Sequence, residues 1–292
     1  MAREKIAVAM HHCLQYGLGD VFRTIYRDQG WFGRLDAATK DYDITVFICS
    51  HNQFTKEVFK YSSNLNVIHL PWQKKHPNYR DLARQKDCRL VKPEFFGPYQ
   101  YQNVDIKIDN RELNRFNSIM QKPVILIHPF AGDPSRMPIP TRNFPKLLQM
   151  LRQKTKSNIV IVGGSYKRGH RLESIKPRNI KEHFVMPSIP SVYNLVNQAT
   201  PRLCAKLTEA AECFIGDWSA YACVAWERQV PMIMFTGPCG YEEFMRRRSN
   251  RFQWNEKCIA INARDKDFNI SFQCAVNNYV KFMKKDNENA TT

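Results

Sequence analysis

The turn after residues 5–10 carries the first side chains that could do chemistry. The apolar run KIAVAM empties into the stretch HHCLQYGLGD at residues 11–20, which ends in the carboxylate of Asp20. Gly17 and Gly19 let the backbone bend tightly there and let another molecule approach the main chain. A carboxylate on such a turn can accept a proton from a hydroxyl group. It can equally cap the helix expected from VFRTIYRD, where a helix N-terminus would lower its pKa and weaken it as a base.

Two adjacent histidines, His11 and His12, precede this turn. Either can orient a substrate or a phosphate group, but neighbouring residues at a strand end point in different directions, so packing is the alternative for one of them. Their spacing matches no metal site, and we expect the protein to use no metal and no other cofactor.

Short apolar runs alternate with longer mixed segments along nearly the whole chain. The runs are continuously apolar, as strands covered on both faces by helices should be, and helical patterns such as FPKLLQMLRQKT lie between them. This order predicts an α/β fold with parallel sheets. The predicted strands are 5–10, 44–49, 66–70, 124–130, 158–164, 183–187, 213–217, 231–237 and 257–262.

The alternation breaks at residues 72–104, which carry seven Lys or Arg, three acidic residues and many aromatic residues. We interpret this segment as an inserted loop region and not as a sheet unit. A polar helical pattern at 110–123 then ends in proline, and we place the domain boundary there. The sequence predicts an N-terminal domain at 1–115, a C-terminal domain at 123–265, and a final helix and tail at 266–292 that packs back toward the N-terminal domain.

Charge and composition narrow the class of protein. The 292 residues include 44 Lys and Arg against 27 Asp and Glu, a net charge of +17 that favours polyanionic partners. No apolar run is long enough to span a bilayer, and the N-terminus lacks the apolar core of a secretory signal, so we expect a cytoplasmic protein. The nine cysteines show no C-x-x-C spacing, and we interpret them as reduced core residues.

Several motifs occur in a fixed order from Val124 onward. They are His128-Pro129, Ser135-Arg136 through Phe144-Pro145, Gly163-Gly164, Asp217-Trp218-Ser219 and Phe235-Thr236-Gly237-Pro238. In this order they resemble the heptosyltransferase family of GT-B glycosyltransferases. The opening Gly19-Asp20-Val21 fits the same pattern, so the resemblance covers most of the chain except residues 72–104.

The resemblance implies a GT-B fold, with two Rossmann-like domains whose parallel sheets face a central cleft. It also implies an inverting glycosyltransferase that uses a nucleotide-sugar donor and in which Asp20 is the catalytic base. Glycines and cations after parallel strands suit a diphosphate, although glycines follow strands in any α/β protein. The implied donor-binding residues are Arg136, Gly163, Gly164, Lys167, Asp217, Trp218, Ser219, Gly237 and Pro238.

The acceptor is expected to lie on the N-terminal domain, where the basic and aromatic residues of 72–104 fall. Cations for phosphates together with rings for unstacked bases suit nucleic acid, so our first hypothesis is a hydroxymethylated pyrimidine in DNA, as for the bacteriophage enzymes that glycosylate such bases. Lipopolysaccharide or another cell-surface saccharide is the alternative. The candidate acceptor-binding residues are His11, His12, Gly17, Gly19, Lys74, Lys75, Arg80, Arg84 and Tyr99.

One departure from the family pattern concerns the acidic turn. The family carries a glycine where this chain has Ser219, and a histidine where it has Ala222. This departure puts ADP-heptose as the donor in doubt, and it leaves open a GT-B-like protein that binds nucleic acid without catalysis.

Overall fold

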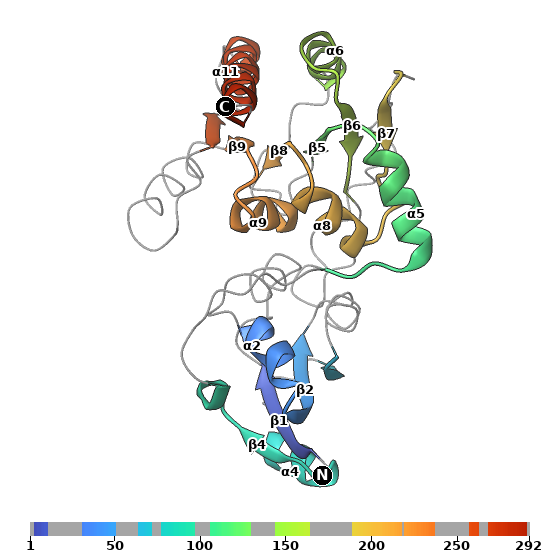
Figure 1. Ribbon diagram of the computed structural model, residues 1–292, viewed down its shortest axis with the longest axis vertical. Helices are drawn as coiled ribbons and strands as arrows, with labels where there is room; N and C mark the ends of the chain where they lie inside the picture. The colour runs from blue at the N-terminus through green and yellow to red at the C-terminus, as the bar shows by residue number, and fades with distance from the viewer. Residues whose placement is uncertain are drawn as a thin grey trace, which may run out of the picture. The chain divides into compact units, whose positions relative to one another are not determined.

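The computed structural model describes residues 3–10, 31–50, 64–71, 77–96, 106–129, 144–163, 189–217, 219–236, 257–262 and 268–290. The chain divides into two compact units: the described residues up to Ile108 belong to the first, and those from Asp109 onward to the second. Each unit contains one parallel sheet with helices packed on it (Figure 1). The predicted α/β class with two parallel sheets is therefore confirmed.

The sheet of the first unit has the strand order β3-β2-β1-β4, and every pair of neighbouring strands is parallel. Three of these strands lie where continuous apolar runs predicted them, because both faces of a covered parallel strand must be apolar. The strands are β1 (Glu4–Met10), β2 (Tyr42–Ser50), β3 (Asn66–Pro71) and β4 (Arg89–Val91).

Helices cover this sheet through its alternating side chains. Helix α2 (Trp31–Ala38) contacts β2 and buries Leu35 completely. Helix α4 (Tyr79–Gln85) contributes Ala83 to a buried cluster with Ala7 and Phe47. The side chain of Asn78 caps α4 by accepting a hydrogen bond from the amide of Asp81.

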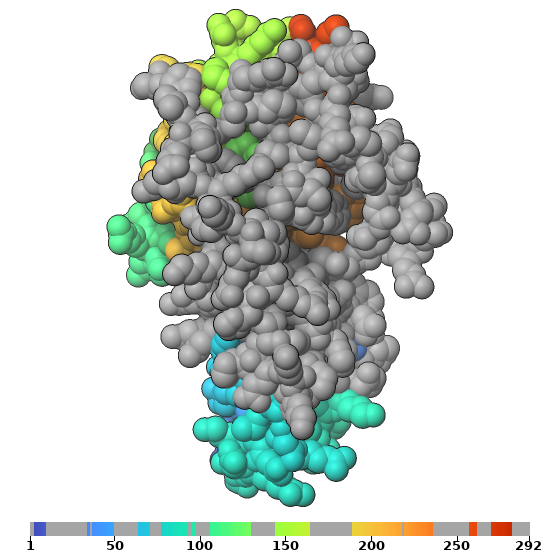
Figure 2. Space-filling model, turned by 180° about the vertical axis from the view of Figure 1, so that it is seen from behind, coloured from blue at the N-terminus to red at the C-terminus, as the bar shows by residue number. Residues whose placement is uncertain are grey.

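The structure corrects the prediction for residues 72–104. Within this segment α4 leads into β4, and β4 pairs in parallel with β1 through Ile6 and Arg89, so the segment supplies a helix and an edge strand of the sheet. A short 3-10 helix, η2 (Pro93–Phe96), follows. Most side chains of α4 are at least partly exposed, and β4 begins with an exposed arginine (cyan and teal in Figure 2). Because the segment is polar, its sequence did not predict this helix and strand.

The second unit contains a larger parallel sheet with the strand order β10-β9-β8-β5-β6-β7. Five of its six strands match predicted apolar runs, and only the three-residue β7 was missed. The predicted strand at 183–187 lies outside the described residues. The strands are β5 (Val124–His128), β6 (Asn158–Ile161), β7 (Val192–Asn194), β8 (Cys213–Asp217), β9 (Met232–Thr236) and β10 (Cys258–Asn262).

Helices α6 (Phe144–Lys154) and α11 (Phe268–Ala290) cover one face of this sheet (Figure 1). Phe272 of α11 stacks on Phe235 of β9 with ring centroids 5.8 Å apart. The described contacts of the C-terminal helix are thus made within the second unit. The expected packing of residues 266–292 back toward the N-terminal domain stays a prediction.

Helices α8 (Pro201–Glu209) and α9 (Ala220–Glu227) cover the opposite face (Figure 1). The two helices are joined by an ion pair in which the Arg228 guanidinium, just after α9, contacts Glu209 Oε1 at 3.0 Å. Strand side chains alternate between the two faces, so Ile125 and Ile127 of β5 face α6 and α11. The side chain of His128 then faces α9.

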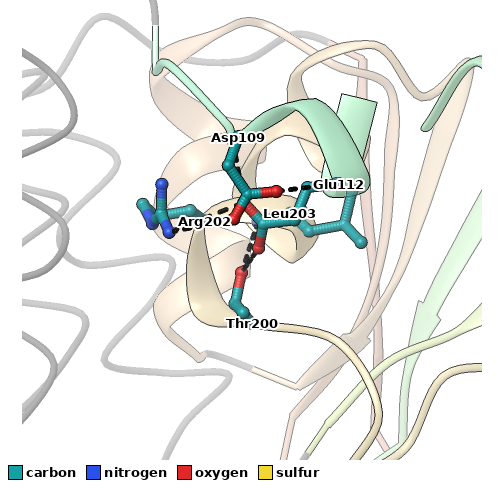
Figure 3. Close-up of polar contacts among 5 residues, drawn as sticks. All are labelled: Asp109, Glu112, Thr200, Arg202 and Leu203. Atoms are coloured by element: carbon teal, nitrogen blue, oxygen red, sulfur yellow. Dashed lines mark hydrogen bonds and ion pairs between the residues drawn. The ribbon is translucent and has the colours of Figure 1, made fainter. Parts of the chain in front are cut away.

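A polar cluster fixes the start of the second unit onto α8 (Figure 3). Helix α5 (Asn110–Ile119), which its polar helical pattern predicted, begins with a capping box between Asp109 and Glu112. Glu112 is buried and accepts a hydrogen bond from the hydroxyl of Thr200, while the buried guanidinium of Arg202 lies 3.6 Å from its carboxylate and 4.0 Å from that of Asp109. The predicted boundary at 110–123 therefore falls on a helix that belongs to the second unit.

The seven described cysteines are free thiols. Four of them are buried in strands and helices, as expected for small core residues, whereas Cys274 is exposed on α11. Among the described helices, none is long and apolar enough to span a membrane.

Candidate functional site

The order in which the chain adds strands to the second sheet reverses between β5 and β8. From β5 the chain adds β6 and β7 on one side, and then crosses to add β8, β9 and β10 on the other. Ligands of open parallel α/β sheets bind outside the carboxyl ends of the strands at such a switch point. The switch point is therefore the candidate binding site of this unit.

His128 ends β5 at the switch point. Its side chain is 8% exposed and packs edge to face against the ring of Tyr221 in α9, with ring centroids 5.3 Å apart. Burial lowers the pKa of His128 to about 4, because an imidazolium would lose its hydration there. The imidazole is thus neutral at physiological pH, and one ring nitrogen can donate while the other can accept.

Gly216 pairs with His128 across the two central strands. A Cβ atom at Gly216 would lie 2.7 Å from the carbonyl oxygen of His128 and 3.1 Å from the ring of Phe214. Only glycine permits this close approach, so the ends of β5 and β8 are held in fixed register at the switch point.

The acidic turn follows directly. Asp217 is the last residue of β8 and is only 4% exposed. Ser219 is the N-cap of α9, and its hydroxyl accepts a hydrogen bond from the amide of Ala222 at 3.3 Å. The first turn of a helix contains amides without intrahelical acceptors and carries partial positive charge, which suits an anionic group. Ala222, at the position of the family histidine, is completely buried.

Gly163 lies at the same edge, two residues beyond the end of β6. Its φ of 146° is a conformation that side chains other than glycine rarely adopt, and its carbonyl accepts a hydrogen bond from the amide of Asn197 at 2.9 Å. Three predicted donor-binding residues, Gly163, Asp217 and Ser219, are therefore brought to the carboxyl edge of one sheet.

The first unit separates two predicted acceptor-binding residues that share one helix. Arg80 lies exposed in the first turn of α4, next to Tyr79, whose ring lies 6.3 Å from that of Phe47. This contact places the start of α4 beside the carboxyl half of β2. Burial and the neighbouring Cys49 thiol raise the pKa of Tyr79 to about 12. Arg84, at the other end of α4, lies 3.7 Å from the carboxylate of Asp81.

Arg84 also lines a hollow of about 530 Å³ at the amino edge of the first sheet, with Arg3, Glu4, Lys5, Asp87, Cys88 and Arg89. An adjoining hollow of about 640 Å³ includes Arg3, Lys5, Thr39, Lys40 and Asp43. Helices α2 and α4 end at this edge, and the Arg3 guanidinium donates to the carbonyl of Thr39 at 2.7 Å. These cations therefore compensate the partial negative charge of helix C-termini. The seven residues of β1 separate this edge from the carboxyl edge by roughly 20 Å.

The described aromatic residues of the basic segment pack against the protein itself. Phe95 contacts Phe96 at a ring-centroid distance of 5.2 Å and Tyr42 at 5.6 Å, and the Arg89 guanidinium lies over the Phe95 ring at 4.9 Å. Arg89 also donates to the carboxylate of Glu4 at 2.7 Å. These contacts engage Phe95, Phe96 and Arg89 of the basic segment within the protein itself, and Phe95 remains 39% exposed.

The remaining predicted site residues lie outside the described residues. They include the candidate base. These residues are Asp20, His11, His12, Gly17, Gly19, Lys74, Lys75, Tyr99, Arg136, Gly164, Lys167, Trp218, Gly237 and Pro238. Within the described ranges, no three His, Cys, Asp or Glu side chains gather as metal ligands would.

Sequence reasoning did not identify His128 and Tyr221 as site residues. His128 ends an apolar strand directly before Pro129, and a polar side chain at that position is a signal for a site residue. The sequence nevertheless indicated it only as part of the motif His128-Pro129. Tyr221 gave no signal, because its role depends on a contact between β5 and α9 that the sequence does not reveal.

The sequence matches no protein-family model and no curated protein. Solved structures do match along nearly the whole chain. ADP-heptose LPS heptosyltransferase II of E. coli matches with a TM-score of 0.58 at 13% identity, over 96% of this chain and 99% of that chain. A glycosyltransferase of family 9 from Veillonella parvula DSM 2008 matches with a TM-score of 0.54 at 14% identity, over 90% and 87%. The E. coli heptosyltransferase WaaC with ADP matches with a TM-score of 0.51 at 12% identity, over 97% and 98%. The chain therefore has the GT-B glycosyltransferase fold of these heptosyltransferases, as its motifs predicted.

Proposed function

We propose that the protein is an inverting glycosyltransferase that moves a sugar from a nucleotide diphosphate donor to a hydroxyl group of an acceptor. The observation that carries this proposal is the switch point of the second sheet, where Gly163, Asp217 and Ser219 lie at one carboxyl edge in a fold that glycosyltransferases share. Such edges bind nucleotides in open parallel sheets.

The donor site divides by chemistry. The first turn of α9, capped by Ser219, supplies partial positive charge for the diphosphate. The carboxylate of Asp217 repels phosphate but accepts hydrogen bonds from hydroxyl groups, so it suits the ribose or the transferred sugar. Arg136, Gly164, Lys167, Trp218, Gly237 and Pro238 complete the proposed site, and the cations among them balance the charge of the diphosphate.

The reaction needs a base on the acceptor side. Asp20 takes the proton of the acceptor hydroxyl while the oxygen of that hydroxyl attacks the anomeric carbon of the donor sugar. The nucleoside diphosphate leaves from the opposite face of the sugar. The sugar configuration is inverted in this single displacement. The proposal includes no metal, since the phosphates are held by amides and cations.

The acceptor we favour is a saccharide, as in the lipopolysaccharide heptosyltransferase whose fold the chain shares. The packed rings of Phe95 and Phe96, the pairing of Arg89 with Glu4, and the place of Arg84 at the amino edge all weaken the case for a nucleic-acid surface. Hydroxymethylated pyrimidine in DNA is the second candidate, supported by the net charge of +17 and by the basic residues Lys74 and Lys75.

Product mass tests the proposal. The purified protein is incubated with ADP-, GDP-, UDP- and CMP-sugars and with either a lipopolysaccharide core oligosaccharide or duplex DNA that contains hydroxymethylcytosine, each with and without EDTA. Unmodified DNA, which lacks the hydroxymethyl group, is the matched control. We expect one oligosaccharide to gain the mass of one sugar, with EDTA making no difference.

Each other outcome has a definite meaning. A mass gain on hydroxymethylated DNA alone would replace the saccharide acceptor by DNA. Loss of product in EDTA would contradict the metal-free mechanism. DNA binding without transfer from any donor would contradict the enzyme and favour the noncatalytic GT-B-like protein.

A further inference from the structure

The side chains of His128 and Tyr221 connect β5, α8 and α9 at the switch point. The imidazole of His128, at the end of β5, meets the ring of Tyr221, in the first turn of α9, at an interplanar angle of 72°. Tyr221 is only 1% exposed, and its hydroxyl hydrogen-bonds the thiol of Cys204 on α8. Burial raises the pKa of the Cys204 thiol to about 12, so this partner stays protonated. Tyr221 thereby ties β5, α8 and α9 together.

The backbone beneath His128 is also fixed. Gly216 approaches the carbonyl oxygen of His128 so closely that no Cβ atom fits between them, so the end of β5 cannot shift along β8. The orientation of the imidazole then depends on the ring of Tyr221. That orientation places a polar ring beside the first turn of α9 at the carboxyl end of β5, where His128 is 8% exposed.

We propose that the imidazole of His128 donates a hydrogen bond to the diphosphate of the donor, and that Tyr221 is the positioning residue that holds it there. This inference rests on the glycosyltransferase function proposed above. A neutral imidazole offers one N–H donor whose presence does not change across physiological pH. It would donate to the same phosphate groups as the amides at the start of α9, which lie beside it.

Binding of nucleoside diphosphates tests both parts. Isothermal titration with ADP, GDP, UDP and CDP identifies the nucleotide that the unmodified protein binds most tightly, and the variants are then titrated with that nucleotide. His128→Phe keeps a ring against Tyr221 and removes the donor. His69→Phe, a substitution of a half-buried histidine on β3 of the first unit, is the matched control.

Two substitutions of Tyr221 separate positioning from stability. Tyr221→Phe removes the hydrogen bond to Cys204 but keeps the ring against His128, whereas Tyr221→Leu removes both. We expect Tyr221→Phe to lower Tm and to leave the Kd within about twofold. We expect Tyr221→Leu and His128→Phe each to raise the Kd by about tenfold or more, as the loss of a hydrogen bond to a charged group predicts. His69→Phe should leave the Kd unchanged.

A spectroscopic arm observes the contact without substitution. The imidazole nitrogen signals of the eight histidines are recorded by NMR, and the signal that His128→Phe removes is assigned to His128. That signal should shift when the nucleotide is added.

The possible failures are distinguishable. If the unmodified protein binds no nucleotide, both this inference and the proposed function are overturned. If it binds but the Kd is unaffected by His128→Phe and Tyr221→Leu, or if the His128 signal does not shift, only this inference is overturned. If the Kd follows Tm across both Tyr221 variants, the role of Tyr221 is structural and its positioning role is overturned.

Discussion

The buried ion pair between Arg202 and Glu112 should hold α5 on α8, and a double-mutant cycle can measure its contribution to stability (Figure 3). Arg202→Met removes the guanidinium and keeps an apolar side chain of similar length. Glu112→Gln removes the charge of the carboxylate and keeps one oxygen, which can still accept from the amide of Asp109, while the new amide nitrogen takes the place of the oxygen that accepts from the hydroxyl of Thr200. Arg111→Met, which changes an exposed arginine next to Glu112 on α5, is the matched control.

The magnitude follows from distance and burial. Two unit charges 3.6 Å apart attract by roughly 5 kcal/mol at an effective dielectric constant of about 20, and desolvation offsets part of this attraction. Removal of Arg202 leaves the buried carboxylate of Glu112 without its closest cation, which costs about 3–4 kcal/mol. Glu112→Gln removes the nearer of the two carboxylates beside Arg202 and keeps the half-exposed Asp109 at 4.0 Å, so it should cost about 2–3 kcal/mol.

The assay is urea unfolding followed by pulsed hydrogen exchange and mass spectrometry, because peptides from α5 and α8 report the second unit separately from the first. The double variant should be about 2 kcal/mol more stable than the sum of the single effects predicts. Arg111→Met should change the free energy of unfolding by less than about 0.5 kcal/mol. Additive effects of the two single substitutions would refute the coupling and with it the anchoring role of the pair.

Three further substitutions test the second unit. Gly216→Ala should destabilise it by about 1–3 kcal/mol, since the new methyl group meets the His128 carbonyl at 2.7 Å; unchanged urea unfolding would contradict the close approach. Ser219→Ala should cost about 1 kcal/mol by removing the cap of α9, and Ser219→Asn should restore it; equal stability of all three proteins would exclude the cap. Burial raises the pKa of Glu212 in the folded state above the ordinary value of 4.5, so its contribution to stability is present at low pH and is lost as the pH rises through the folded-state pKa. Glu212→Gln should therefore reduce the loss of stability as the pH rises above about 4.5 in a series of urea titrations, and an unchanged pH profile would contradict this assignment.

The central strands of both sheets could be predicted from sequence because each is a continuous apolar run. Val124 to His128 and Cys213 to Asp217 are buried on both faces, as strands covered by helices on both sides require. The edge strand Arg89–Val91 could not be found in this way, since it has three residues and begins with an exposed arginine. Asn78, followed by Asp81 three residues later, was the available signal for α4, but the surrounding charges suggested a loop.

The site was predictable where backbone chemistry decides residue type. Gly163 and Ser219 follow strands and occupy positions that need a positive φ and a helix cap, so their types are informative by themselves. Arg84 and Phe95 illustrate the opposite case, because charge and aromaticity do not show which edge of a sheet a residue faces or whether it is already paired. The meeting of His128 with Tyr221 depends on how α9 packs on the sheet, which local patterns do not encode.

The most direct test of the central claim is turnover by Asp20→Asn. Asparagine caps a helix about as well as aspartate but cannot accept the acceptor proton, so the variant should fold normally, bind the nucleotide with unchanged Kd, and form no glycosylated product. Turnover by Asp20→Asn at the rate of the unmodified protein, measured by the mass of the product, would contradict the proposed mechanism.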